Sequence, residues 1–215
     1  MKIRIAALLT LIVALAGCAA PGKSTYSDHQ NGLLRSATQT STSALRHTQS
    51  VAVVFSENTK ANQAYLEHYH SVAQNSQQLD EQVQQAYISS SEPSLAIDWF
   101  KTSLQAQFAS VTFYDNLDSL MAARPDVIVM LDTRSTLVSA QSADVKASIV
   151  AEFFDAQLNY IGKAEGHADQ SMASVWAQNK NAPEIAAVIN QQHTVQVSAL
   201  QQFDSSLDSL FNVKS

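Results

Sequence analysis

Residues 126–131 read DVIVML, and this short apolar run predicts a buried β-strand. Side chains alternate across a strand, so Val127, Val129 and Leu131 would face one side of a sheet. Ile128 and Met130 would face the other side. Because both sides are apolar, we expect the strand to be central in its sheet and covered on both faces.

The residues before this strand predict two further strands joined by helices. Residues 51–55 (VAVVF) form a second apolar run, and residues 111–114 (VTFY) form a third. A long Gln-rich helix over 61–90, a helix that begins at Glu92-Pro93, and a short helix over 117–123 lie between them. Right-handed crossovers would make these strands parallel.

The residues after the strand predict a hairpin and a long helix. Segments 147–154 and 160–168 flank Asp155 and Asn159, which favour turns; a single strand over 148–161 is the alternative. A helix over 183–211 closes the chain. The predicted fold class is mixed α/β, with a sheet of four or five strands in two or three layers and the order β-α-α-β-α-β-hairpin-α.

The predicted strands resemble two families of envelope proteins. Residues 51–55, 108–115, 126–132 and 153–159 are similar to segments in the amino-terminal domain of TolB and in CsgG-like periplasmic domains. The resemblance implies a small α/β domain that serves an envelope assembly. The chain departs from it in the Gln-rich helix and in lacking an amphipathic pore-forming hairpin pair, which argues against a channel.

The amino terminus predicts export and lipidation. Lys2 and Arg4 precede the apolar run 5–15, which at about 1.5 Å per residue is too short to cross a bilayer and is typical of a signal peptide. Leu15, Ala16, Gly17 and Cys18 follow, and this LAGC motif resembles the lipobox of bacterial lipoproteins. The resemblance implies recognition of Leu15-Ala16-Gly17 by the signal peptidase, cleavage before Cys18, and palmitate-type acyl chains on Cys18.

The same resemblance implies a location. Ala19 stands where lipoproteins retained in the inner membrane often carry Asp, so we expect lipid anchoring in the outer membrane, facing the periplasm. We expect residues 1–17 to be the signal peptide, 18–50 a lipidated Ser/Thr/Gln-rich tether, and 51–215 one periplasmic domain. Leu33, Leu34 and Leu45 are tether positions able to dock on that domain.

The net charge and the cysteine content of the sequence indicate which kinds of partner to expect. Loss of Lys2 and Arg4 with residues 1–17 would take the formal charge from −6 to −8, which argues against nucleic acid as a partner. Cys18 is the only cysteine, so neither a disulfide nor a thiolate metal site is expected. A protein partner in the envelope, and the membrane through the acyl chains, are the expected contacts.

The sequence contains few residue patterns that are typical of catalysis. The chain has no G-x-S-x-G elbow and no Gly-rich phosphate loop, and we expect no cofactor. His68 and His70 lie on opposite sides of a helix, so a shared metal is not expected. If there is a hydrolase, its best residues are Asp115 and Asp132, predicted at the ends of adjacent strands.

The interpretation that follows is a non-enzymatic docking lipoprotein. Its predicted partner surface is Tyr65, Tyr69 and Val72, the start of a heptad-like seam on the Gln-rich helix; packing on the chain's own sheet is the alternative. Trp99 and Trp176 are interpreted as packing residues. A lipoprotein that binds an amphiphile, and the hydrolase, are the competing functions.

Overall fold

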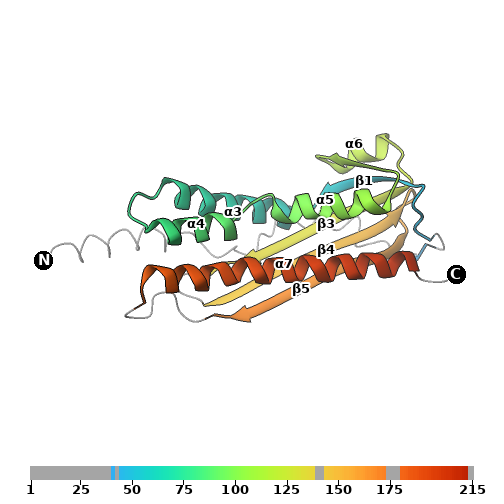
Figure 1. The fold of residues 1–215 in the computed structure, drawn as a ribbon. Coiled ribbons are helices and arrows are strands. Elements are labelled where there is room, and N and C mark those ends of the chain that lie inside the picture. The colour runs from blue at the N-terminus through green and yellow to red at the C-terminus, as the bar shows by residue number, and fades with distance from the viewer. Residues whose placement is uncertain (1–39, 42–43, 139–142, 173–179, 213–215) are drawn as a thin grey trace, which may run out of the picture.

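The computed structural model describes residues 40–41, 44–138, 143–172 and 180–212. Its elements alternate strands and helices and then end in a hairpin and a long helix (Figure 1). In chain order they are β1 (Ser50–Phe55), α3 (Glu57–Asn75), α4 (Glu81–Ser90), α5 (Leu95–Gln107), β2 (Ser110–Tyr114), α6 (Leu117–Ala122), β3 (Val127–Thr136), β4 (Asp144–Asp155), β5 (Tyr160–Ser171) and α7 (Ala182–Asn212).

The sheet has five strands in the order β2-β1-β3-β4-β5. Strand β1 pairs in parallel with β2 and β3, as the crossover rule predicted. Strands β3, β4 and β5 pair antiparallel, which confirms the hairpin and excludes a single strand over 148–161. The mixed α/β sandwich is therefore the fold.

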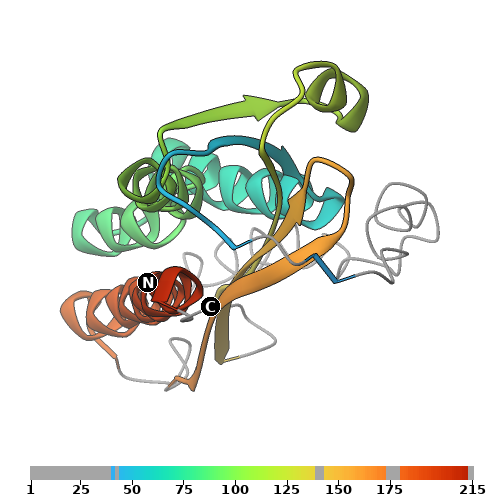
Figure 2. The ribbon, with the colours of Figure 1, turned by 90° about the vertical axis from the view of Figure 1, so that its right-hand side faces the viewer.

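The two faces of β3 are buried in different clusters, as its alternation predicted. Val127, Val129 and Leu131 belong to the main core under α5 and α7. Ile128 and Met130 belong to a smaller cluster with Leu120 of α6. In Figure 2, α5 and α7 lie on one side of the sheet, and α6 lies away from them near β2. The fold thus has three layers at β1 and β3, while α7 supplies the helical layer at the hairpin.

The Gln-rich segment is not one helix. The prediction of a continuous helix over 61–90 is wrong, because α3 ends at Asn75 and α4 begins at Glu81. The Asp80 carboxylate caps α4 by accepting from Gln82 N at 2.9 Å. Gln84 Nε2 donates to Ala73 O at 2.9 Å, which satisfies a carbonyl at the end of α3. The predicted order gains one helix, and the heptad seam is divided between two.

The last residues of the predicted tether lie on the domain. Leu45 is buried in the main core, as its apolar side chain suggested. The His47 ring stacks on Phe211 of α7 with centroids 4.9 Å apart, and its Nδ1 lies 2.8 Å from Gln107 O. Contacts with the domain therefore begin before β1. Leu33 and Leu34 lie outside the described residues.

Candidate functional site

The carboxylates predicted as a catalytic pair are not brought together on adjacent strands. Strand β1 lies between β2, which ends at Tyr114 before Asp115, and β3, which contains Asp132. The prediction of adjacency is wrong because the first crossover carries the chain to one side of β1 and the second carries it to the other. Asp115 is exposed in the turn after β2.

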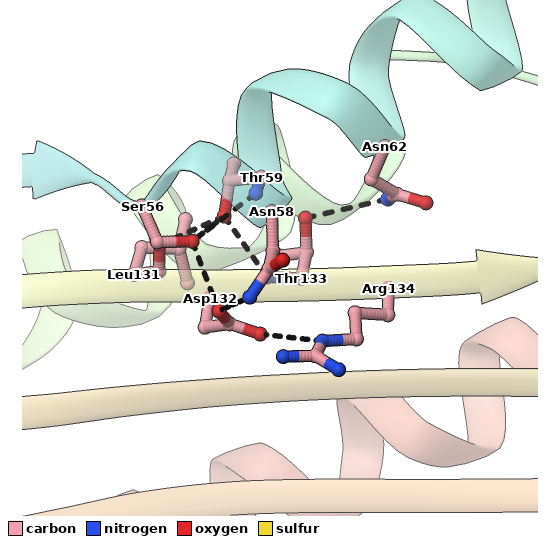
Figure 3. Close-up of polar contacts among 8 residues, drawn as sticks. All are labelled: Ser56, Asn58, Thr59, Asn62, Leu131, Asp132, Thr133 and Arg134. Carbon is pink, nitrogen blue, oxygen red and sulfur yellow. Dashed lines mark hydrogen bonds and ion pairs between the residues drawn. The ribbon is translucent and has the colours of Figure 1, made fainter. Parts of the chain in front are cut away.

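The Asp132 carboxylate takes part in hydrogen bonds that fasten the start of α3 to β3, and we call this contact the α3/β3 joint (Figure 3). Its Oδ2 accepts from Asn58 Nδ2 at 2.6 Å and from Ser56 Oγ at 3.0 Å. Its Oδ1 accepts from Arg134 Nε at 3.2 Å. The Oδ2 atom therefore holds the chain that leaves β1, while Oδ1 pairs with Arg134 of β3, and this arrangement explains the aspartate without catalysis.

A neighbouring set of side chains completes the same joint. Here β3 continues beyond the end of β1 and is paired on one side only, with β4. Thr59 Oγ1 donates to Leu131 O at 2.7 Å and accepts from Thr133 N at 2.9 Å. Asn62 Nδ2 donates to Thr133 Oγ1 at 3.3 Å. Buried backbone groups need such partners. Helix α3 thus supplies, through its side chains, the hydrogen bonds that β1 no longer provides (Figure 3).

The predicted partner surface on α3 is partly used by the fold. Tyr65 Oη accepts from Leu137 N at 3.1 Å, and burial raises the pKa of Tyr65 to about 12 against the opposing effect of that bond. The Tyr69 ring lies 4.9 Å from the Tyr65 ring, centroid to centroid, and is half-buried. Val72 is 38% exposed. Docking on this surface stays a prediction that rests mainly on Tyr69 and Val72.

The histidines serve separate local contacts. His70 Nδ1 lies 3.1 Å from Ile88 O, and its Nε2 lies 2.8 Å from Gln74 Nε2, so this ring joins α3 to α4. His167 is exposed and lies 3.4 Å from Glu165. Among the residues that the structure describes, no three His, Cys, Asp or Glu side chains are placed to hold a metal ion.

One hollow at the surface was not predicted from the sequence. It is an open groove of about 710 Å³ between α5 and α7, which we call the α5/α7 groove. Figure 1 shows α4 and α5 following one another along α7. The groove is lined by Glu92, Ser94, Leu95, Asp98, Trp99, Thr102, Ser103, Ala106, Gln107, Asp204, Leu207 and Asp208.

Hydrogen bonds from α5 to two aspartates of α7 cross between the helices at the groove. Trp99 Nε1 donates to Asp204 Oδ2 at 2.9 Å, and Ser103 Oγ donates to the other oxygen of Asp204. Gln107 Nε2 donates to Asp208 Oδ1 at 2.7 Å. All three donors are neutral, so these bonds orient the carboxylates without cancelling their charge. Trp99, interpreted as a packing residue, both packs on the core and lines the groove.

The sequence carried little signal for this groove. Glu92, Asp98, Asp204 and Asp208 look like ordinary exposed helix residues, and the two pairs are about a hundred residues apart. Only the pairing of α5 with α7 brings them together. Acidic residues outnumber basic residues along α7, but no pattern in the sequence indicated that this helix would meet α5.

The predicted lipidation site lies outside the described residues. Leu15, Ala16, Gly17 and Cys18 belong to the segment before Thr40, and Trp176 also falls outside the described part of the chain. Within that part, no helix has the length and apolar character needed to cross a bilayer.

Comparisons with known proteins give similarity of fold at low identity. No family model matches the chain, and no curated protein matches its sequence. Solved structures that match include protein CT253 from Chlamydia trachomatis, with 10% identity over 78% of this chain and 99% of that one and a TM-score of 0.38. A PelC dodecamer from Paraburkholderia phytofirmans matches with 12% identity over 74% and 96%, at a TM-score of 0.30. Lipoprotein GNA1162 from Neisseria meningitidis matches with 11% identity over 66% of this chain and 96% of that one, at a TM-score of 0.28. Likenesses this distant do not bear on function.

Proposed function

We propose that this chain is a lipoprotein of the bacterial cell envelope, anchored through acyl chains on Cys18, whose α/β domain docks another envelope component. The observation that carries the anchor is the order of the amino terminus: cationic Lys2 and Arg4, an apolar run too short to span, and then LAGC at residues 15–18. Residence in the outer membrane, facing the periplasm, is part of the proposal because Ala19 follows the cysteine.

Docking fits the geometry better than hydrolysis does. Asp132 already accepts hydrogen bonds on both carboxylate oxygens, and Asp115 lies beyond a different, non-adjacent strand. A general base must reach the proton that it abstracts, within about 2.6–3.2 Å or through one water. Neither aspartate has a reactive hydroxyl or imidazole of the described residues at hydrogen-bond distance other than Ser56, whose hydroxyl also caps α3.

Docking also fits better than transport of an amphiphile. A lipid carrier needs an enclosed apolar cavity that covers most of the ligand surface. The α5/α7 groove is open and has four carboxylates in its lining. A second hollow, near Gln196, has room for about 20 Å³, far less than an acyl chain.

The proposed anchor is tested by Cys18→Ser, with Ser24→Ala as the matched control just outside the motif. Cells are labelled with radioactive palmitate and their membranes are separated on a sucrose gradient. Because the thiol is the expected acceptor of lipid, Cys18→Ser should lose the label and leave the outer-membrane fraction, while Ser24→Ala keeps both. Mature-length Cys18→Ser protein in the outer membrane would contradict the proposal, as would wild-type protein in the inner membrane.

The predicted α3 surface is retained as one docking candidate, and the α5/α7 groove is the second. The groove is favoured because its side chains carry charge that no described neighbour neutralises, whereas Tyr65 on α3 is committed to Leu137. Val72→Asp disturbs the α3 surface without touching the core and so separates the two candidates.

A further inference from the structure

We propose that the α5/α7 groove binds a lysine-bearing helical segment of a partner protein. This inference rests on the proposed docking function and names the chemistry of the partner. Three independent features of the groove support it: its charge, its apolar wall, and an unpaired buried acceptor at one end.

The groove has strong negative charge without compensation. Its lining includes Glu92, Asp98, Asp204 and Asp208 but no Lys, Arg or His. None of these carboxylates takes part in an ion pair within the described chain. Asp208 also lies about one turn from the carboxyl end of α7, where the helix dipole disfavours negative charge. A cationic partner would supply the ion pairs that these carboxylates lack within the described chain.

The apolar part of the lining suits the stem of a lysine. Leu95, Trp99 and Leu207 lie beside the acidic residues. A lysine side chain packs its methylene stem on apolar surface and keeps its ammonium among polar groups. An ammonium near the Trp99 ring would add a cation–π attraction.

A buried acceptor without a donor lies next to the groove. A small cavity of about 20 Å³ shares Glu92 and Leu95 with the groove and is also lined by Gln196. Gln196 is 7% exposed; its Nε2 donates to Ser90 O at 2.9 Å, which fixes the amide orientation, and its Oε1 has no hydrogen-bond partner. A buried acceptor that is left unpaired is destabilising, because it has lost its hydrogen bonds to water without gaining others. A donor that reaches the small cavity would satisfy it.

The volume of the small cavity limits which hydrogen-bond donor of a partner can enter it. About 20 Å³ holds one group of the size of water, and a terminal ammonium is of that size, whereas a planar guanidinium is larger. The lining of the groove runs along α5 from Leu95 to Gln107, roughly 20 Å at 1.5 Å per residue, which is too long for one small amine. The occupant that matches both length and charge is a helix with lysines on one side.

The probe is a fluorescein-labelled amphipathic helix of about five turns, with lysine along one face and leucine along the other. Fluorescence anisotropy measures its binding to the soluble domain that begins at Ala19. Wild type should bind the lysine peptide at least about threefold more tightly than an arginine version, and a glutamate version should not bind. Raising NaCl from about 0.05 to 0.3 M should weaken binding, since screening shortens the reach of the charges.

Matched pairs of variants distinguish binding at the groove from attraction to the acidic domain as a whole. Asp98→Asn with Asp208→Asn removes two groove charges, and Asp208→Asn keeps an oxygen for Gln107. Glu67→Gln with Asp118→Asn removes the same charge from exposed sites outside the groove. The groove pair should weaken lysine-peptide binding at least about fivefold and the control pair less than about twofold. Gln196→Leu should abolish the preference for lysine over arginine.

Several outcomes would overturn the inference. Equal loss of binding in both pairs of charge variants would mean attraction to the acidic domain as a whole. A lack of binding by wild type would mean that the groove is not a site for a cationic peptide. Equal binding of lysine and arginine peptides would remove the role of Gln196. If a partner captured from solubilised membranes is released by Val72→Asp and not by the groove pair, the groove inference fails while the docking function survives. If no partner is captured with any variant, the docking function itself fails.

Discussion

Asp155 shows how much of this fold depends on single polar side chains. It is 8% exposed at the end of β4 and accepts hydrogen bonds from Ser41 Oγ at 2.8 Å and from Asn159 Nδ2 at 3.0 Å. It also accepts from the backbone N–H groups of Gln157 and Asn159. Burial raises the pKa of the Asp155 carboxyl, but the four hydrogen bonds outweigh it and hold the pKa below its ordinary value. The charged form thus ties the hairpin turn to the segment before β1.

The lowered pKa of Asp155 predicts acid sensitivity. Because the unfolded carboxyl, with a pKa of about 3.9, binds a proton more readily than the folded one, its contribution is complete above about pH 4. That contribution is lost as the pH falls through the lower folded pKa. Urea unfolding at about pH 7, 4 and 3 should show a steeper loss for wild type than for Asp155→Asn, which is less stable by about 1–3 kcal/mol at pH 7. Exposed Asp169→Asn is the control, and equal slopes for wild type and Asp155→Asn would contradict the assignment.

At the scale of elements, α7 packs very close to the edge strand β5. A Cβ at Gly166 would lie 1.9 Å from Ala199 O and 2.6 Å from Phe203 N, so only glycine allows this approach. The helix also covers the edge of the strand: Ser206 Oγ accepts from Glu165 N at 3.0 Å, and Gln202 Oε1 accepts from His167 N at 3.4 Å. Helix α7 thereby blocks pairing with another strand along that part of β5.

This packing predicts that two glycines of one strand respond differently to the same change. Gly166→Ala forces a methyl into the α7 backbone, which cannot yield locally, and should cost more than about 3 kcal/mol, the upper range for ordinary overpacking. In Gly162→Ala the methyl meets the Leu210 side chain at 3.0 Å, which can rotate, so the cost should stay below about 1.5 kcal/mol. Chemical denaturation of both variants measures the difference. Equal destabilisation would show that α7 does not lie this close to β5.

The elements also show where sequence reasoning succeeds. The alternation in residues 127–131 indicated both clusters, because period-two patterns report the two sides of a strand directly. Asp155 and Asn159 marked the hairpin turn because their side chains bond local backbone. The break between α3 and α4 was missed because Gln and Ser sustain a heptad-like pattern through Ser76, and the Asp80 cap is a weak signal within it. The α5/α7 groove was missed because it arises only from tertiary pairing.

For the whole molecule, the chain enters the domain at one end of the sheet. Ser41 lies at the β4–β5 turn, Leu45 enters the core, and His47 stacks near the end of α7. In Figure 1 this end lies opposite the connection between α3 and α4. Residues 19–39 would separate this entry from the proposed anchor by at most about 75 Å when extended. The proposed anchor and the candidate docking surfaces are therefore linked by a chain long enough to let the domain reach a partner.

The most direct test of the proposed anchor is the mass of the mature amino-terminal peptide. Tryptic digestion of protein purified from membranes should release residues 18–23, from Cys18 to Lys23, because Lys23 is the first cleavage site after the cysteine. We expect this peptide to carry a diacylglycerol group on the Cys18 sulfur and an acyl chain on its amine. A peptide containing Cys18 with a free thiol, or one that continues upstream to Arg4, would contradict it.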